Sequence, residues 1–168
     1  FNLSDIYYGL QLQLLLYMDA FIKTGKVLIK DEPGIGGVFY FRIMDPVVND
    51  YELKGADPEQ LLYKKFCMSG LACSDPEVLE ALDADLLPGV RSEVIGVYKK
   101  KDGTITGSAV NKDFYESLME YTVSKAGEIG QKIVDGDVSI SPVVNGKNIP
   151  CDYCDYRSIC CFDEKSGN

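Results

Sequence analysis

Three cysteines within one short segment have the residue type and spacing best suited to chemistry. Cys151, Cys154 and Cys160 follow the pattern C-x2-C-x5-C. The first two thiolates lie on one tight turn, the third can close over the same ion, and thiolates select zinc, copper(I) or iron–sulfur clusters. A structural zinc site or a cubane cluster needs four ligands, and the chain contains no histidine. The pattern therefore predicts a metal site that takes its fourth ligand from elsewhere.

The spacing leaves the identity of that fourth ligand open. The candidates are Cys161, Cys67, Cys73 and a cysteine outside this chain. Adjacent cysteines rarely chelate one ion comfortably, so we expect Cys161 to leave the site incomplete. Cys67 and Cys73 are expected to be small packed side chains rather than ligands. The alternative is that the whole segment is a group of reduced, packed cysteines without a metal.

A second pair of residues, Gln13 and Tyr17, is also suited to a functional site. The two are four apart in the sequence, so on a helix they lie one turn above each other on a single face. A buried glutamine costs free energy unless its amide is hydrogen-bonded, and Gln13 would then need partners. The alternative is a glutamine at the helix edge in contact with water, with Tyr17 simply packed.

The helix that must position this pair is expected at about residues 4–24. Ser4 is a suitable N-cap, Asp5 in the first turn complements the helix dipole, and Gly25 follows the last turn. The leucines between residues 10 and 16 leave little polar surface. The helix is therefore expected to be largely buried.

The other expected elements alternate between helices and short strands. Proline follows aspartate at Asp57-Pro58 and at Asp75-Pro76, which predicts the starts of two short helices. A long helix at about residues 112–135 is expected to end before Gly136. The strands, turns and remaining segments are a turn at 33–37, a strand at 38–44 stopped by Asp45-Pro46, a hairpin around 94–98 and 104–107, a strand at 138–143, a turn at Asn145-Gly146 and the cysteine segment 151–161. The apolar stripe expected on the long helix consists of Phe114, Leu118, Tyr121, Ala126, Ile129 and Ile133.

Length and composition indicate one globular domain, and the expected helices and strands make it α+β. Of the 168 residues, 46% are hydrophobic, which is enough for a real core, and no apolar run is long enough to span a membrane. The six crowded cysteines fit metal or thiol chemistry in a reducing compartment, which favours the cytoplasm. A formal charge of −9 argues against a free-standing nucleic-acid binder with a broad basic face. The lysines at 99–101 are expected at a solvated hairpin tip.

Two of these segments resemble a known nuclease family. Residues 7–17, YYGLQLQLLLY, resemble the Q-x-x-x-Y helix of the RecB-like branch of the PD-(D/E)XK nucleases, and the cysteine segment is similar to the iron–sulfur segment of that branch. Together with residues 37–46, GVFYFRIMDP, they resemble the C-terminal nuclease domain of the AddB-type subunit of AddAB-type ATP-dependent helicase–nucleases. The resemblance covers essentially the whole chain.

The resemblance implies a partial restriction-endonuclease-like core in which Gln13 and Tyr17 are auxiliary catalytic residues. In this family a strand pair that bears an aspartate, a second acid and a lysine holds Mg²⁺, and the metal activates a water and stabilises the charge that develops on the phosphate. Gln13 would orient a carboxylate, a water or the phosphate, and Tyr17 would position the DNA backbone or brace Gln13. Cys151, Cys154 and Cys160 would bind a structural 4Fe–4S cluster whose fourth ligand comes from an earlier segment of the parent chain.

The aspartate and D/E-x-K strands have no counterpart in this sequence, which opens at Phe1 as if cut from a longer chain. We therefore expect an inactive piece of a parent that cleaves DNA in double-strand break repair by homologous recombination. The parent would use ATP, bind DNA ends and form a heterodimer with the AddA-type subunit. The alternatives are another cluster-bearing RecB-like exonuclease, or a non-enzymatic interaction module stapled by an iron–sulfur cluster or zinc. An exposed sheet edge could also pair two copies of the piece in a non-native dimer.

Overall fold

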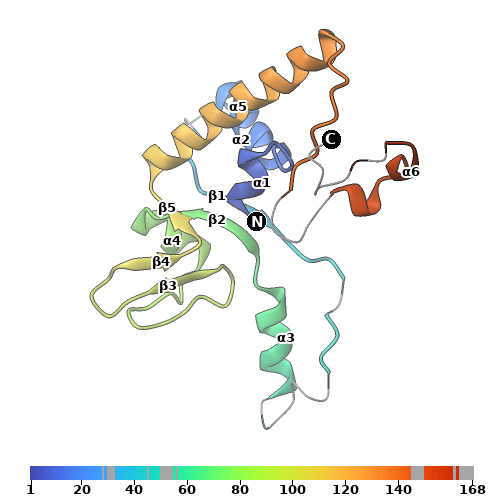
Figure 1. The fold of residues 1–168 in the computed structure, drawn as a ribbon. Coiled ribbons are helices and arrows are strands. Elements are labelled where there is room, and N and C mark those ends of the chain that lie inside the picture. The colour runs from blue at the N-terminus through green and yellow to red at the C-terminus, as the bar shows by residue number, and fades with distance from the viewer. Residues whose placement is uncertain are drawn as a thin grey trace. The chain divides into compact units, whose positions relative to one another are not determined.

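The computed structural model describes residues 1–27, 29, 33–44, 46–49, 55, 57–144, 150–160 and 162. The chain forms two compact units: the first contains Phe1 and residues 13–120, and the second contains residues 2–12 and the chain from Tyr121 onward. Helices and short strands alternate along the sequence (Figure 1), which confirms the predicted α+β class. None of the helices in the described ranges is long and apolar enough to cross a membrane.

The first helical region differs from the single helix expected at residues 4–24. Two helices, α1 (Leu3–Tyr7) and α2 (Gln13–Thr24), are separated by a turn, and α2 leads into a short 3₁₀ turn at Gly25–Val27. Gly9, between the helices, has a φ of +81°, a left-handed conformation that glycine adopts without a side-chain clash. The expectation of one continuous helix is therefore wrong, although its predicted end near Gly25 is confirmed.

The start and the burial of this region also correct the prediction. Asn2, rather than Ser4, caps α1, because the Asn2 side-chain oxygen accepts a hydrogen bond from the Ser4 backbone N–H at 3.0 Å. Within the two helices, which are described in full, the buried residues are Ile6 and Leu15. Leu10 in the intervening turn is 49% exposed. The leucine-rich run therefore does not form a largely buried helix.

A three-stranded sheet in the first unit has the order β1-β2-β5 (Figure 1). β1 (Gly37–Tyr40) pairs antiparallel with β2 (Ser69–Cys73), and β2 pairs parallel with β5 (Ala109–Val110). All residues of β2 except the first are buried. The sequence of β2, Ser-Gly-Leu-Ala-Cys, contains no β-branched residue and no alternation of apolar and polar side chains. A central strand of this kind gives no period-2 pattern, so it was not predicted.

The strand predicted at residues 38–44 is shorter in the structure. Its ladder ends where Tyr40 lies opposite Ser69, and residues 41–44 continue outside any strand. Asp45, which was expected to help stop the strand, lies outside the described residues. The segment that leaves the ladder at this point, residues 41–44, lines a hollow.

Two short helices begin at the aspartate–proline pairs, as predicted. α3 (Pro58–Phe66) is capped by Asp57, whose carboxylate accepts a hydrogen bond from the Glu59 N–H at 3.1 Å. α4 (Pro76–Leu82) is capped in the same way by Asp75, where the corresponding bond measures 2.9 Å. Because proline has no N–H to satisfy and its φ is already helical, each pair favours a helix start locally.

The predicted hairpin is formed by β3 (Val97–Lys99) and β4 (Ile105–Gly107), which pair antiparallel. Its turn is closed by a backbone hydrogen bond of 2.8 Å from the Lys100 N–H to the Thr104 C=O. Lys100 and Lys101 are exposed at this tip, as expected. β3 begins three residues later than the strand predicted from residue 94.

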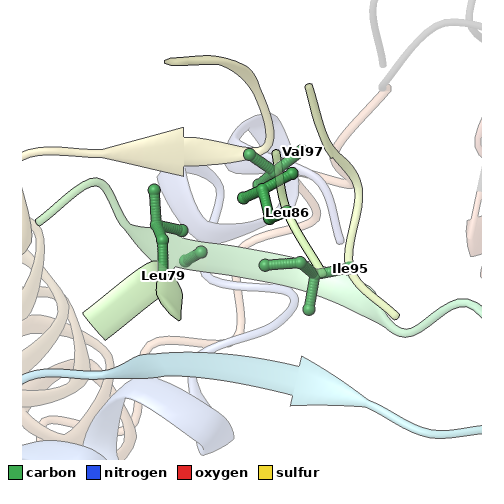
Figure 2. Packing of buried hydrophobic residues seen from close by; sticks show 5 residues of the cluster. Leu79, Leu86, Ile95 and Val97 are labelled. Atoms are coloured by element: carbon green, nitrogen blue, oxygen red, sulfur yellow. The ribbon is translucent and has the colours of Figure 1, made fainter. Parts of the chain in front are cut away.

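A cluster of buried apolar side chains joins the hairpin to α4 and β2. Figure 2 shows Leu79, Leu86, Ile95 and Val97 with their side chains gathered together. Each is at most 6% exposed, and Ala72 of β2 belongs to the same cluster. Burial of this apolar surface supplies the main folding free energy of the region.

A buried serine fixes the loop that precedes β3. Ser92 is 5% exposed, and its hydroxyl donates to an Asp83 carboxylate oxygen at 2.6 Å. The serine oxygen in turn accepts the backbone N–H groups of Val94 and Ile95 at 3.1 and 3.0 Å. The buried hydroxyl is therefore fully used in hydrogen bonds, as burial of a polar group requires.

The long helix α5 (Lys112–Val134) confirms the helix predicted at about residues 112–135. Asp135 follows the helix, and Gly136 after it has a φ of +71°. The Gly136 N–H donates to the Ile133 C=O at 3.1 Å, which satisfies one of the carbonyls left free at a helix end. The predicted role of Gly136 is therefore also confirmed.

The predicted stripe on α5 is confirmed only in part: Leu118, Ala126 and Ile129 are half-buried, whereas the fully buried residues lie one position later than Phe114, Leu118 and Tyr121. Tyr115, Met119 and Thr122 are buried, whereas Phe114 is 41% exposed. The tyrosine hydroxyl donates a hydrogen bond to the Leu71 C=O of β2, so the ring can be buried with its polar tip satisfied. The predicted stripe places Phe114 inside instead of Tyr115, and the sequence pattern alone did not distinguish between these two positions.

The prediction of a strand at residues 138–143 is wrong, because none of these residues lies in a strand. The Asp137 carboxylate accepts the backbone N–H and the hydroxyl of Ser139 at 2.9 and 2.6 Å. A local turn of this kind competes with strand pairing, and Val138 is 90% exposed. The turn predicted at Asn145-Gly146 lies outside the described residues.

Candidate functional site

The predicted pair Gln13 and Tyr17 lies on the first turns of α2. Gln13 is the first residue of the helix, and its Nε2 donates a hydrogen bond to the Tyr17 Oη at 2.7 Å. Both side chains are exposed, Tyr17 by 62%. The glutamine is therefore not buried, and the tyrosine is not simply packed. The two are partners of each other because their spacing places them on one helix face.

This pair can offer one acceptor and one donor to a ligand. Gln13 uses an amide hydrogen toward Tyr17, and its Oε1 can accept a further hydrogen bond. The Tyr17 oxygen accepts from Gln13, so its own proton can be donated. The nearest acid along this helix, Asp19, is paired with Lys23 at 2.8 Å. The pair is thus suited to hold a water or a phosphate oxygen by hydrogen bonds.

The cysteine segment consists of the 3₁₀ turn η2 (Pro150–Tyr153) and the short helix α6 (Arg157–Cys160), neither of which contains a buried residue. The Cys151 C=O accepts the N–H of Cys154 at 3.3 Å, so the tight turn expected between these two cysteines is present. Cys151 and Cys160 are half-buried, and Cys154 is exposed. Short-range backbone hydrogen bonds thus determine the local shape of this segment.

The donor types in this segment fit a thiolate-bound metal. Cys151, Cys154 and Cys160 all carry free thiols, and thiolates are the ligands that zinc and iron–sulfur clusters prefer. Across the residues that the structure describes, no three Cys, Asp or Glu side chains are grouped closely enough to hold a metal ion. Cys161 lies outside the described residues. Ligation by the three cysteines therefore stays a prediction.

The two remaining cysteines differ in their surroundings. Cys73 is 3% exposed in β2, which agrees with the expectation of a packed side chain. Cys67 is half-buried after the end of α3. Burial raises the pKa of the Cys67 thiol, and the positive charge of Arg91 opposes this with a smaller effect. Burial therefore favours the protonated thiol at this position.

The sequence did not predict that Arg42 lines one hollow of the first unit while Lys64 and Arg91 line a second, with Cys67 bordering both. They come from three separate segments, so only the fold brings them together. A weak signal was available: Arg42 directly follows Phe41, and Lys64 directly follows Tyr63. Basic residues interleaved with aromatic ones are typical of surfaces that bind single-stranded nucleic acid.

Comparison with known proteins relates this arrangement to a family. The sequence profile of the PD-(D/E)XK nuclease superfamily matches residues 1–161. The chain belongs to the PD-(D/E)XK nuclease superfamily. The matched range includes the Gln13–Tyr17 pair on α2 as well as the cysteine segment.

The chain is also similar to proteins named as the B subunit of an ATP-dependent helicase/deoxyribonuclease. It is 36% identical over 165 residues to the protein of Alkaliphilus oremlandii, 37% over 166 residues to that of Bacillus subtilis and 35% over 166 residues to that of Clostridium perfringens. Each alignment covers 97% of this chain. The chain spans 14% of the length of each relative. The resemblance inferred from the sequence is therefore confirmed.

Proposed function

We propose that this chain is the C-terminal part of the nuclease domain in one subunit of an ATP-dependent DNA helicase–deoxyribonuclease. The observation that carries the proposal is the exposed, hydrogen-bonded Gln13–Tyr17 pair at the start of α2 in a member of a nuclease superfamily. The similarity to proteins of Alkaliphilus oremlandii and Bacillus subtilis that are named as helicase/deoxyribonuclease subunits supports the same assignment.

The reaction in the parent would be hydrolysis of a DNA phosphodiester bond. Mg²⁺ held by acids elsewhere in the parent would activate a water and neutralise developing charge. The Tyr17 hydroxyl would donate a hydrogen bond to a phosphate oxygen, and the Gln13 Oε1 would accept one from a water. Their mutual bond of 2.7 Å restricts both side chains before substrate binds, which lowers the entropy cost of positioning the reacting groups.

We further propose that the 168-residue chain does not cleave DNA by itself. In this family the acid-x-lysine strand precedes the helix that carries the Q-x-x-x-Y pair, whereas the acid-x-lysine triplets of this sequence, at 52–54 and 163–165, both follow α2. Within the described ranges, no group of three acids or cysteines could hold a metal ion. The chain would contribute substrate positioning, while the principal acids and the lysine come from other parts of the parent.

Cys151, Cys154 and Cys160 would supply three thiolates to a structural 4Fe–4S cluster, and a cysteine elsewhere in the parent would supply the fourth. Support comes from the three free thiols and from the lack of buried residues in η2 and α6. Since side-chain burial gives this segment little stability, ligation would order it, as metal binding orders other small sites.

In the cell, the parent would act in the cytoplasm on DNA ends during double-strand break repair by homologous recombination. Its ATP chemistry would lie outside this chain. The relatives are each named as one subunit of a larger enzyme, which supports assembly of the parent with a second, AddA-type subunit. Cleavage polarity and strand choice would be set by that larger assembly.

Substitutions in the subunit-length protein, assembled with its partner, test the role of the pair. Gln13→Ala and Tyr17→Phe should each lower Mg²⁺-dependent DNA cleavage by about 100-fold through lost positioning. Gln11→Ala is the matched control, because Gln11 is also exposed but lies outside α2. Unchanged cleavage in Gln13→Ala would contradict the proposed role. Clear cleavage by the isolated 168-residue chain that Gln13→Ala abolishes would contradict its inactivity.

Anaerobic metal analysis of the subunit-length protein tests the cysteine assignment. Iron and sulfide of about four each per subunit, with broad absorbance in the visible range, are expected. Cys154→Ser should lower both contents, whereas Cys73→Ser serves as a control at a cysteine buried in β2. One equivalent of zinc in place of iron would show the same thiols in a different role and would contradict the cluster.

A further inference from the structure

A hollow in the first unit opens where β1 and β2 stop pairing. The ladder ends with Tyr40 opposite Ser69. Beyond this pair, residues 41–44 continue without strand pairing. On the β2 side, the segment before Ser69 leads back through Cys67 to the end of α3. The two diverging segments border an open hollow of about 480 Å³.

Two contacts hold the diverging chains in place. The rings of Phe41 and Phe66 stack with their centroids 6.3 Å apart and an interplanar angle of 17°. The Lys65 Nζ donates a hydrogen bond to the Val47 C=O at 2.6 Å. The stretch after β1 is therefore fastened to α3 at two points, so the hollow has defined walls.

A second hollow shares one lining residue, Cys67, with the first. It has a volume of about 440 Å³ and lies between the end of α3 and the loop that precedes β3. The Met68 N–H donates to the Val94 C=O at 2.8 Å and joins these two segments. Cys67 lines both hollows, and we call the two together the paired hollows.

Basic side chains dominate the charge of the paired hollows. Arg42 and Lys65 line the first, Lys64 and Arg91 line the second, and Glu93 is the one carboxylate among the described lining residues. The chain as a whole has a formal charge of −9. A concentration of positive charge on such an acidic protein indicates an anionic ligand.

Exposed aromatic side chains lie beside these cations. Phe41 is 61% exposed although one part of its ring contacts Phe66, and Tyr40 is 44% exposed. Cations and open rings together match a single nucleic-acid strand, because phosphates contact the cations while unpaired bases stack on the rings. A duplex keeps its base faces inside, and an acidic protein segment has carboxylates without stacking bases, so neither uses the rings in this way.

We propose that the paired hollows bind single-stranded DNA, with Arg42, Lys64 and Arg91 on phosphates and Phe41 stacked on a base. The inference rests on the proposed function, from which DNA follows as the ligand. It concerns a different surface, because neither Gln13 nor Tyr17 lines these hollows. The surface would hold one strand of an opened DNA end by contacts that do not depend on base sequence.

Equilibrium binding of a fluorescent oligothymidylate of about 20 nucleotides tests the proposal. Anisotropy is measured with the 168-residue chain in EDTA over a series of salt concentrations. Arg42→Ala combined with Arg91→Ala should reduce the slope of log affinity against log salt by about 1.4, because two phosphate contacts are lost. Phe41→Leu should weaken binding about tenfold at fixed salt and leave the slope unchanged, because it removes stacking but no charge.

The matched control removes two positive charges from another place. Lys100 and Lys101 are exposed at the hairpin tip. The double variant Lys100→Ala, Lys101→Ala should leave both the affinity for the oligonucleotide and the salt slope nearly unchanged. Circular dichroism of every variant checks that the fold is retained, and Arg42→Lys should preserve the slope.

Several outcomes would overturn the proposal. They are an absence of strand binding by the wild-type chain, an equal loss in the hairpin control, and tighter binding of a duplex or of polyglutamate than of the single strand. The last result would assign the surface to a different partner. Because EDTA removes Mg²⁺ and no cleavage is scored, failure here leaves the role of Gln13 and Tyr17 intact. Conversely, unaltered cleavage by Gln13→Ala would leave strand binding intact.

Discussion

The cluster around β3 and the cysteine segment are stabilised in opposite ways. Leu79, Leu86, Ile95 and Val97 are each at most 6% exposed, whereas η2 and α6 contain no buried residue. The cluster takes its stability from apolar burial. The cysteine segment has short-range backbone bonds and an exposed ion pair of 2.8 Å between Arg157 and Asp152, and exposed pairs contribute little.

Apolar residues in a sequence do not by themselves indicate a core. Tyr153, Tyr156 and Ile159 belong to the cysteine segment, and they are 91%, 71% and 79% exposed. A segment that leaves such side chains in water has a low free energy of local opening. Ligation of its thiols or contact with another protein would supply the stability that burial supplies around β3.

The largest expected effect comes from a cavity in the cluster. Ile95→Ala removes most of a side chain that is 0% exposed, and the free energy of unfolding should fall by about 2–5 kcal/mol. Urea unfolding followed by circular dichroism measures the change. Ile159→Ala is the matched substitution in the cysteine segment, and its effect should stay within about 0.5 kcal/mol. Equal losses in the two variants would remove the contrast between the regions.

A smaller loss is expected from the buried serine beside the cluster. Ser92→Ala leaves an Asp83 oxygen and two backbone N–H groups without the hydroxyl they contact. The free energy of unfolding should fall by about 1–3 kcal/mol, because buried polar groups lose their partner. Ser158→Ala, at an exposed position of α6, is the comparison in urea unfolding. A neutral Ser92→Ala would mean that water replaces the hydroxyl.

The third effect depends on pH. Burial raises the pKa of Tyr115, against a smaller lowering by a backbone hydrogen bond at Val38. In the unfolded chain the phenol ionises near its ordinary pKa of 10, whereas in the fold it keeps its proton. The contribution of the protonated Tyr115 to the free energy of unfolding is thus complete below pH 10. Above pH 10 it falls, by at most about 1.4 kcal/mol per pH unit.

Urea unfolding between pH 9 and 11 (about one unit on either side of the free phenol pKa) measures this loss. Tyr115→Phe should be less stable than the wild type at neutral pH and should lose less stability as the pH rises. Tyr156→Phe, in the exposed segment, is the matched control. Parallel pH curves for wild type and Tyr115→Phe would contradict the burial of the phenol.

The smallest effect is expected in the cysteine segment itself. Arg157→Ala removes the exposed ion pair with Asp152, so the free energy of global unfolding should change by about 0–1 kcal/mol, and less at high salt. Hydrogen exchange at Cys160, whose N–H is bonded to the Tyr156 C=O, should report any local loosening. A large global loss would show that this segment supports the core.

The elements with local signals were predicted from the sequence. The caps at Asp57 and Asp75, the hairpin tip and the end of α5 before Gly136 each depend on a few neighbouring residues. The break at Gly9 was missed because the leucine pattern continues across it. β2 was missed because a strand buried on both faces has no period-2 pattern.

The candidate site was predictable in part for the same reason. The four-residue spacing of Gln13 and Tyr17 predicted a shared helix face, and their hydrogen bond agrees with it. The exposure of Gln13 agrees with the alternative of a glutamine in contact with water, whereas the exposure of Tyr17 was not predicted, because it depends on which parts of the chain cover α2. The convergence of Arg42, Lys64 and Arg91 on the paired hollows depends on three distant segments. Ligation by the three cysteines stays a prediction.

The hydrogen bond from Tyr115 to Leu71 joins residues 44 positions apart. Closing a long loop costs entropy before its contacts form, so the capped helices and the hairpin should form earlier than this contact. We expect Tyr115→Phe to accelerate unfolding and to leave the refolding rate nearly unchanged, as stopped-flow experiments in urea would measure. The contact of Tyr115 with β2 would then determine how long the folded region survives, rather than how fast it forms.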